Sequence, residues 1–332
     1  MITIADIGRE LGISAMTVSR ALNGHRAVSP ETRQRVLSYA ERSKYRPNRL
    51  ARSLVTRKSH IVGIIIPDIS HTFFSEVTRA VQDALELQGY DLMLCHTHGS
   101  IEREAAAIEM LLCSKVDGLI VASSRPETAP GIFADLQRES TPFVLLDRFF
   151  ANLDCAHAGT DDVLVGRLAA QHLIDLGHRA IGYIGGPQIS VARQRFEGFC
   201  AVMAENRLHL RPQWVKGGKF DMDSGCLAMQ QMLALPHRPT AVFAANDPAA
   251  IGAIRACREA GLVVPQQMSI VGAGSIEASF YPSPFLTTID WSRKELGETA
   301  AAMLLDAING VAVQGKTILP HLLIRQSTAP LL

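Results

Sequence analysis

Apolar residues recur at helical spacing at the start of the chain. The apolar positions 4, 7 and 11 predict a first helix, which Gly12 is placed to end in a left-handed conformation. Ser14 is a suitable N-cap for a second helix over residues 15–22, and Ser29 followed by Pro30 predicts the start of a third. Two short helices joined by a glycine-containing turn are typical of a helix-turn-helix motif.

From residue 60 onwards, strand-like and helical segments alternate. Strands are predicted at 60–66, 90–96, 118–122, 143–147, 180–185, 241–245 and 268–271. Amphipathic helices are predicted between them, around 73–88, 101–114, 130–139, 163–176, 192–206, 223–234 and 248–260. This alternation, with near-continuous Val, Ile and Leu runs, predicts doubly wound parallel sheets in two α/β lobes. Ligands of such sheets bind at the carboxyl ends of the strands, so we expect a binding cleft between the lobes.

Charge is divided unevenly between these two regions. The first 60 of the 332 residues contain 12 Lys and Arg against 4 Asp and Glu, a net charge of +8. The remaining residues contain 21 against 28, a net charge of −7. A basic head on an acidic body is typical of a protein whose head binds a polyanion, although a solvated basic face has the same composition. The helix-turn-helix pattern favours DNA.

The composition excludes several other classes. With 47% hydrophobic and 20% charged residues, the chain has ample material for globular cores. The sequence has no apolar run of the roughly 18 residues that a membrane span needs, and no secretory signal is visible. We therefore expect a cytoplasmic protein without a membrane partner. The six cysteines are scattered without a Cys-x-x-Cys pair, so we expect neither structural disulfides nor a zinc site.

The second helix of a helix-turn-helix enters the major groove with its N-terminal side chains on the base edges. Ala15 and Met16 stand there, and because both are apolar they suit contact with a thymine methyl group. Arg20, one turn further on, is suited to hydrogen-bond guanine O6 and N7. The alternative is that Arg20 is a solvated arginine on the surface. Polar side chains that we expect to reach phosphates, and so to fix the register, are Thr17, Ser19 and Asn23.

A further short helix is predicted after Pro47. Asn48 is its cap, and residues 51, 54 and 55 form an apolar row. A helix of this length is marginal alone in water and needs a partner or DNA to hold it. Leu54 is suited to wedge between base steps in the minor groove, although a plain linker explains the same residues.

Several motifs of this basic region occur together in one known family. The motifs are Ile4-Ala5-Asp6-Ile7, Gly12-Ile13-Ser14, Thr17-Val18-Ser19-Arg20-Ala21-Leu22-Asn23, Val28-Ser29-Pro30-Glu31-Thr32-Arg33, Tyr45-Arg46-Pro47-Asn48 and Ala51-Arg52-Ser53-Leu54. They resemble the LacI/GalR family of bacterial transcription regulators, and residues 16–20 resemble the recognition helix of its gluconate-type members. The resemblance implies a homodimer on a near-palindromic operator, with paired hinge helices that open the central minor groove. The DNA contacts that we expect are Thr3, Ser14, Ala15, Met16, Thr17, Ser19, Arg20, Asn23, Ser29, Asn48, Ala51, Arg52 and Leu54.

The body resembles the periplasmic sugar-binding-protein fold that this family uses as its sensor. Matching stretches are Phe73-Phe74-Ser75-Glu76, Val116-Asp117-Gly118-Leu119-Ile120, Leu176-Gly177-His178-Arg179, Asn246-Asp247-Pro248-Ala249-Ala250-Ile251-Gly252 and Pro284-Phe285-Leu286-Thr287-Thr288-Ile289. The resemblance implies three crossings between the lobes, near 159–162, 288–292 and 317–321. We therefore expect a headpiece at 1–46, a hinge helix and linker at 47–59, and an effector-binding core at 60–332. Lobe one would comprise about 60–160 and 291–318, and lobe two about 161–289 and 319–332.

Candidate effector-binding residues stand at or just after strand ends. Aromatic side chains there suit the apolar face of a sugar ring, and an arginine suits a carboxylate or a pair of hydroxyls. The candidates are His71, Phe73, Phe74, Asp162, Arg195, Phe220, Asn246, Asp247 and Ser275. Some have structural alternatives: one of the two adjacent phenylalanines suits the core, and Asp247 suits the N-cap of the helix that follows it.

Two departures from the family pattern bear on the ligand. Gly274 and Ser275 stand where relatives commonly carry acidic residues, and His71-Thr72-Phe73 stands where many have Asn-Pro-Phe. The loss of a carboxylate and the gain of a histidine make the site less negative. Our hypothesis is that the effector is a sugar acid or a phosphorylated sugar rather than a neutral pentose or hexose.

Two other classes of protein are less consistent with the sequence. For an enzyme, Gly272-x-Gly274 would need a third glycine at 277, where Glu277 stands, and neither a phosphate-binding loop nor a nucleophile elbow is present. A transport binding protein shares the body fold, but the headpiece and the absence of a visible signal peptide oppose it. The sequence therefore predicts a DNA-binding repressor controlled by a sugar-like effector, without enzymatic activity, cofactor or metal.

Overall fold

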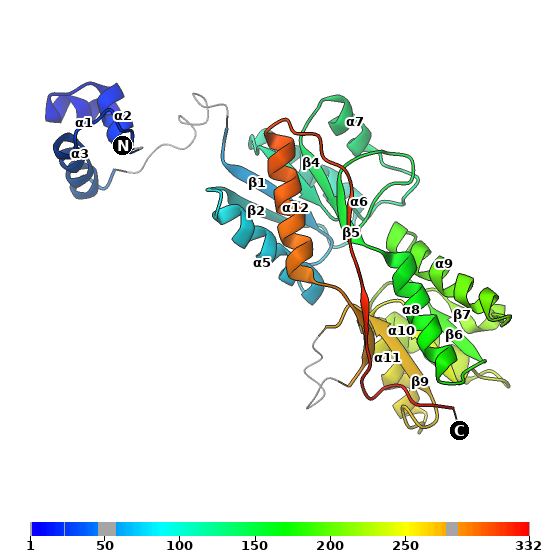
Figure 1. Cartoon of the computed structure of the whole chain (residues 1–332). Coiled ribbons are helices and arrows are strands. Elements are labelled where there is room, and N and C mark those ends of the chain that lie inside the picture. Colours follow the sequence, from blue (N-terminus) through cyan, green and yellow to red (C-terminus); the bar gives the residue numbers. More distant parts are fainter. Residues whose placement is uncertain (1, 23, 46–57, 277–284, 332) are drawn as a thin grey trace. The chain divides into compact units, whose positions relative to one another are not determined.

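The computed structural model describes residues 2–22, 24–45, 58–276 and 285–331 (Figure 1). The chain forms two compact units, Met1–Ser59 and His60–Leu332. Most of the predicted hinge, 47–59, lies outside the described residues. So do five of the predicted DNA contacts, namely Asn23, Asn48, Ala51, Arg52 and Leu54.

The described part of the first unit contains α1 (Ile4–Leu11), α2 (Ala15–Leu22) and α3 (Pro30–Arg42). Each helix begins at a hydroxyl side chain that accepts a hydrogen bond from the backbone of the first turn; these caps are Thr3, Ser14 and Ser29. Gly12 ends α1 at a φ of 67°, as predicted. Apolar side chains from all three helices and from the segment before α3 form a small core, whose buried members are Ile7, Val18, Ala21, Val28, Val36 and Ala40.

Two six-stranded sheets form within the described residues of the second unit. The first, in lobe one, has the order β11-β5-β4-β3-β1-β2 and consists of β1 (Ile61–Ile66), β2 (Asp91–His96), β3 (Gly118–Val121), β4 (Phe143–Leu146), β5 (His157–Thr160) and β11 (Lys316–Ile318). The second, in lobe two, has the order β12-β10-β9-β8-β6-β7 and consists of β6 (Ile181–Ile184), β7 (Val215–Lys216), β8 (Ala241–Ala244), β9 (Ser269–Ala273), β10 (Thr287–Asp290) and β12 (His321–Leu323).

Helices cover both sheets (Figure 1). Those of lobe one are α5 (Thr72–Glu86), α6 (Ile101–Cys113), α7 (Ile132–Arg138) and α12 (Arg293–Ile308). Those of lobe two are α8 (Asp162–Asp175), α9 (Ser190–Glu205), α10 (Met222–Leu233) and α11 (Asp247–Glu259). Every residue of β3, β4, β6, β8 and β9 is buried, as expected of parallel strands that are covered on both faces. Neighbouring strands pair in parallel, except for β10 and β12, which are antiparallel. The predicted doubly wound parallel sheets are confirmed.

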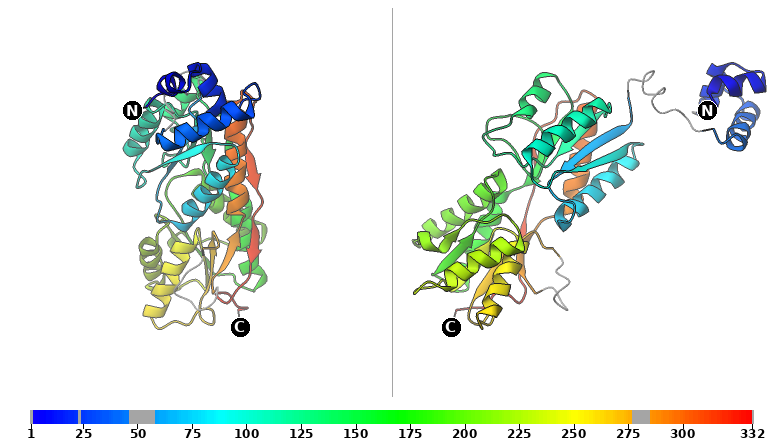
Figure 2. Two further views of the ribbon diagram at one scale, coloured as in Figure 1. Left: turned by 90° about the vertical axis from the view of Figure 1, so that its left-hand side faces the viewer. Right: turned by 180° about the vertical axis from the view of Figure 1, so that it is seen from behind.

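Within the described residues, the chain crosses between the lobes three times. It passes from β5 to α8, from β10 to α12, and from β11 to β12. Figure 2 shows the segment after α12, in red, running along both lobes of this unit. Because β10 and β12 lie in lobe two while α12 and β11 lie in lobe one, each lobe is built from separate stretches of sequence.

Lobe two depends on a close approach of α8 and α9. A Cβ at Gly198 would overlap the carbonyl oxygen of Val163, and one at Gly166 would overlap that of Arg195. The two helices therefore pack backbone against backbone, which places Arg195 of α9 next to the first residue of α8. Glycine is required at these positions because no other residue leaves this space.

We predict that Gly198→Ala lowers the free energy of unfolding by about 1–3 kcal/mol, because the added methyl group overpacks the α8–α9 contact. Gly217→Ala is the matched control, because a Cβ at Gly217 meets no atom within 4 Å. Urea denaturation, followed by circular dichroism, measures the free energy of unfolding of both variants. Equal stabilities of the two variants would contradict the close approach.

Candidate functional sites

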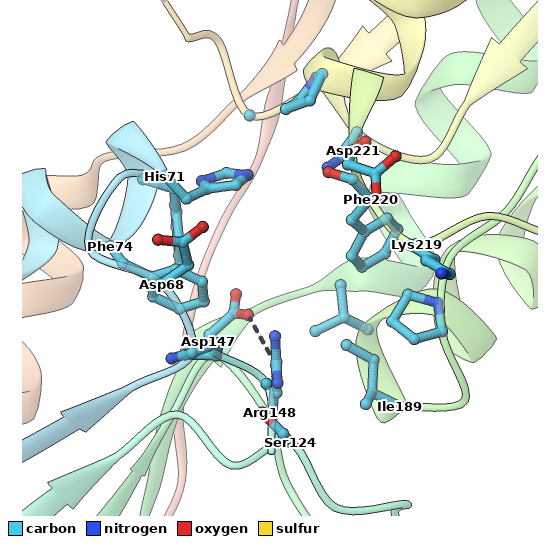
Figure 3. A pocket seen from close by; sticks show the side chains of 18 of the residues that line it. Asp68, His71, Phe74, Ser124, Asp147, Arg148, Ile189, Lys219, Phe220 and Asp221 are labelled. Carbon is cyan, nitrogen blue, oxygen red and sulfur yellow. Dashed lines mark hydrogen bonds and ion pairs between the residues drawn. The ribbon is translucent and has the colours of Figure 1, made fainter. Parts of the chain in front are cut away.

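A cavity of about 530 Å³ lies between the two lobes of the second unit. Residues just after β1, β4, β8 and β9 line it: Pro67, Asp147 and Gly274 directly follow their strands, and Asn246 is the second residue after β8. In Figure 3, the side chains of Asp68, His71 and Phe74 of lobe one face those of Lys219, Phe220 and Asp221 of lobe two, and Asp147 and Arg148 lie below them in this view. The cavity therefore lies at the carboxyl ends of both sheets, where ligands of α/β folds bind.

The structure brings most of the predicted effector residues to this cavity. Those that line it are His71, Phe73, Phe74, Arg195, Phe220 and Asn246. Asp162, Asp247 and Ser275 lie behind its wall instead, and all three are buried. Polar groups of all three side chains are engaged by other parts of the protein.

Asp162 orients Arg195. The Nε of Arg195 donates to Oδ1 of Asp162 at 2.7 Å, and its Nη1 donates to the carbonyl of Ala245 at 2.6 Å. The two side chains are 4% and 2% exposed, and burial raises the pKa of Asp162 to about 7 although Arg195 opposes this shift. The guanidinium also lies 5.0 Å from the centre of the Trp291 ring. Asp162 thus holds a cation in the cavity wall and does not line the cavity itself.

Asp247 fastens α11 to the neighbouring strands. Asn246, and not Asp247, is the N-cap of α11, because its side chain accepts a hydrogen bond from the backbone of the first turn. The alternative in which Asp247 caps the helix is therefore wrong. Asp247 accepts hydrogen bonds from the Thr288 hydroxyl at 2.6 Å and from the Ile276 amide at 2.8 Å. Burial raises the pKa of Asp247 to about 6.

The turn after β9 contributes backbone to the cavity wall. Gly274 lines the cavity at a φ of 123°, and Ser275 follows at a φ of 49°. The Ser275 hydroxyl accepts a hydrogen bond from Nη2 of Arg325 at 3.1 Å, and its amide donates to the Thr288 hydroxyl. The wall therefore presents backbone where the family pattern suggests a carboxylate.

Several buried polar atoms of the cavity residues lack a partner. Among the described residues, the lining side chains whose buried atoms have no hydrogen-bond partner are His71 (Nδ1), Ser124 (Oγ), Arg148 (Nε) and Trp291 (Nε1). Buried polar groups in folded proteins are normally satisfied, so such atoms indicate that something else completes the site. Arginine and indole nitrogens are donors, so the missing partner carries acceptors.

Sequence reasoning missed some of the lining residues. Arg148 and Asp147 stand at the end of a predicted strand, and Asp68 follows another, so the strand-end rule could have found all three. The Nε of Arg148 lies 3.8 Å from Oδ2 of Asp147, and burial raises the pKa of Asp147 while Arg148 opposes that shift. Burial also lowers the pKa of His71, against the attraction of Asp68. Trp291 follows β10, which the sequence did not predict.

In the first unit, the predicted base-reading side chains stand on the surface of α2. Met16 is 62% exposed and Arg20 is exposed, whereas Ala15 is half-buried. Thr17 and Ser19 are also half-buried. The caps Thr3, Ser14 and Ser29 are exposed at helix N-termini, where backbone amides favour anions such as phosphates.

The chain matches known families along most of its length. The profile of "Bacterial regulatory proteins, lacI family" matches residues 3–48. The profile of "Periplasmic binding proteins and sugar binding domain of LacI family" matches residues 59–327. The second match begins next to the boundary between the two structural units, and residues 49–58 separate the two matches.

Curated relatives and solved structures agree with these matches. The transcriptional repressor PurR of Yersinia enterocolitica is 38% identical over 325 residues, which cover 97% of this chain and 94% of that one. The lac repressor dimer bound to operator and the anti-inducer ONPF is 28% identical with a TM-score of 0.89, covering 99% of each chain. A regulator from Enterococcus faecium with bound ribose is 31% identical with a TM-score of 0.72, covering 82% of this chain and 99% of that one.

None of the helices in the described ranges combines the length and the apolar character that a membrane crossing requires.

We predict that Asp247→Asn changes how stability depends on pH. The folded pKa of about 6 lies above the ordinary 3.8, so the wild-type contribution is complete below about pH 4 and is lost as the pH rises through 6. Relative to the variant, the wild type should lose up to about 3 kcal/mol of unfolding free energy across this range. Urea denaturation at pH 4, 5, 6 and 7 measures the difference, and a constant difference would contradict the assignment.

Proposed function

Because the chain belongs to the LacI family of bacterial regulatory proteins, we propose that it is a repressor whose first unit binds an operator and whose second unit binds a sugar-like effector. As a member of this family it is a DNA-binding transcriptional regulator. We propose further that it acts in the cytoplasm as a homodimer on a near-palindromic operator. The lac repressor was solved as a dimer on its operator, which supports this arrangement.

The exposed surface of α2 supports the proposed reading of DNA. Arg20 presents a guanidinium that suits guanine, and Met16 presents an apolar side chain that suits a thymine methyl group. The basic charge of this region attracts phosphates without regard to sequence. Since one arginine and one apolar residue give limited direct readout, dimer spacing and DNA shape carry part of the specificity.

The unpartnered buried atoms of the cavity are the observation that carries the proposed effector site. A polyhydroxyl ligand supplies acceptors to the Nε of Arg148 and the Nε1 of Trp291, and its hydroxyls can either donate to or accept from the Nδ1 of His71. The aromatic rings of Phe74 and Phe220, on opposite sides of the cavity in Figure 3, suit the apolar faces of a sugar ring. The volume of about 530 Å³ suits a small molecule.

The charges of the cavity favour an acidic sugar. Among the described residues, its lining includes three acidic and three basic side chains: Asp68, Asp147 and Asp221 against Arg148, Lys219 and Arg195. Burial raises the pKa of Asp147 and lowers the pKa of Arg148, in each case against the attraction of the other side chain. With Gly274 in place of a carboxylate, the cavity leans towards an anion. We therefore propose a sugar acid or a sugar phosphate.

The three crossings suggest how the two sites communicate. A ligand that contacts both lobes favours one angle between them over others, which shifts the population of that state. Lobe one begins at β1, directly after the segment that leads from the headpiece. In a dimer the lobe angle would therefore set the spacing of the two headpieces and so the affinity for the operator. Coupling of this kind is typically worth about 1–3 kcal/mol, or about 5–150-fold in affinity.

We predict that the full-length protein binds D-gluconate more tightly than its neutral parent D-glucose. Arg148→Gln should weaken gluconate binding about 10–100-fold, because a charge-assisted hydrogen bond is lost, and should change glucose binding much less. Arg103→Gln, an exposed position on α6, is the control and should bind as the wild type does. Isothermal titration calorimetry measures the binding of D-gluconate and of D-glucose to the wild type, Arg148→Gln and Arg103→Gln. Binding of neutral sugars alone would contradict the acidic ligand.

We predict that Arg20→Gln weakens binding to an operator selected from random duplexes by about 1–3 kcal/mol, because a bidentate contact to guanine is lost. Binding to unrelated DNA should change much less. Arg42→Gln removes an exposed charge from α3 in the same unit and is the matched control. Fluorescence anisotropy at two salt concentrations measures both variants. Equal losses on selected and unrelated duplexes would show that Arg20 contacts phosphate rather than a base.

A further inference from the structure

Arg293, the first residue of α12, binds groups from both lobes at once. Its Nε pairs with the carboxylate of Glu76 on α5 in lobe one. Its Nη1 donates to the carbonyl of Gly274 at 2.6 Å and to Asp290 at 3.1 Å, and its Nη2 donates to the carbonyl of Ser275 at 3.4 Å. The side chain of Arg293 is 18% exposed and that of Glu76 is 39% exposed, so the guanidinium is mostly shielded from water while its carboxylate partner is only partly so.

The two carbonyls belong to the turn that forms part of the cavity wall. Gly274 and Ser275 both have positive φ, at 123° and 49°, a conformation that needs external support at a non-glycine residue. On the lobe-two side, that support comes from Asp247, which accepts from the Ile276 amide, and from Arg325, which donates to the Ser275 hydroxyl. Arg293 supplies the support from lobe one.

We propose that Arg293 is a positioning residue that couples the turn at 274–276 to α5 across the crossing between β10 and α12. The inference rests on the proposed effector cavity, because α5 begins beside His71 and Phe73, which line one side, while Gly274 lines the other. A guanidinium has donors enough for Glu76 and the two carbonyls together, and it holds them in a fixed plane. A rotation of one lobe against the other must stretch or break these bonds.

A local structural role and the proposed coupling differ in what Glu76 does. If Arg293 merely completed α12, neutralising Glu76 on α5 would leave the turn of lobe two unchanged. If Arg293 positions the turn, loss of the Glu76 charge frees the guanidinium, and the effect appears in the other lobe. The readout is therefore the protection of amides 274–276, which donate to Ile289, Thr288 and Asp247.

The test is hydrogen–deuterium exchange on the full-length protein without added ligand. We expect Glu76→Gln and Arg293→Gln each to speed exchange at residues 274–276 about tenfold, since local opening follows the free energy of the contacts that hold it. The double variant should exchange no faster than Arg293→Gln alone, because both changes break one connection. Arg293→Lys, which keeps the charge but has fewer donors, should be intermediate.

Lys294→Gln is the matched control, because Lys294 is 81% exposed and pairs with Glu298 within α12. If Arg293→Gln does not fold, Glu76→Gln carries the test, because it keeps the shape of its side chain. Wild-type exchange in Glu76→Gln, or additive effects in the double variant, would overturn the proposal.

A second arm follows operator affinity with and without D-gluconate. Coupling of this kind typically changes affinity about 5–150-fold. We expect D-gluconate to change the operator affinity of Glu76→Gln several-fold less than it changes that of the wild type. A wild type that binds neither D-gluconate nor D-glucose would contradict the proposed ligand, while the ligand-free exchange experiment would still decide the role of Arg293.

Discussion

The three chain crossings of the second unit are the constraint on which its other features depend. In the described residues, β10 of lobe two leads into α12 of lobe one, and β11 of lobe one leads into β12 of lobe two. Each sheet therefore receives an edge strand, β11 or β12, from the last part of the chain. The lobes cannot separate without breaking their own sheets, but they can rotate about the short connections. A rotation of this kind would change the shape of the cavity between them.

The buried arginines of the cavity wall impose a second constraint on this arrangement. A guanidinium removed from water is tolerated only when it is paired and hydrogen-bonded. Arg195 meets this condition through Asp162 and the carbonyl of Ala245, which fix it in the wall before any ligand arrives. Arg148 is less complete, because its Nε lies 3.8 Å from Asp147 and has no hydrogen-bond partner among the described residues. The fold holds both arginines, since the Nη1 of Arg148 donates to the carbonyl of Ser123, but Arg148 keeps one donor without a partner.

Much of the fold was predictable because its central strands are buried on both faces and therefore appear as unbroken apolar runs. The helix α12 was not predicted, since it contacts both α5 and the sheet and has no narrow apolar stripe. The strand β7, of two residues, is too short to leave a pattern. For the site, the sequence indicated which strand ends carry polar residues. It could not indicate that Asp247 turns towards Thr288, because that partner lies 41 residues away.

Polar residues at the strand ends have two possible roles: they contact a ligand, or they support the residues that do. A side chain at a strand end can face the cavity or support the wall behind it, and long-range partners decide which. Asp162, Asp247 and Ser275 all support the wall, so they set the positions of Arg195, Ile276 and Gly274. Arg293 extends this support across the lobes. Since the supporting groups belong to both lobes, a ligand that shifts the wall would strain contacts in both, and the angle between the lobes is the degree of freedom that relieves such strain.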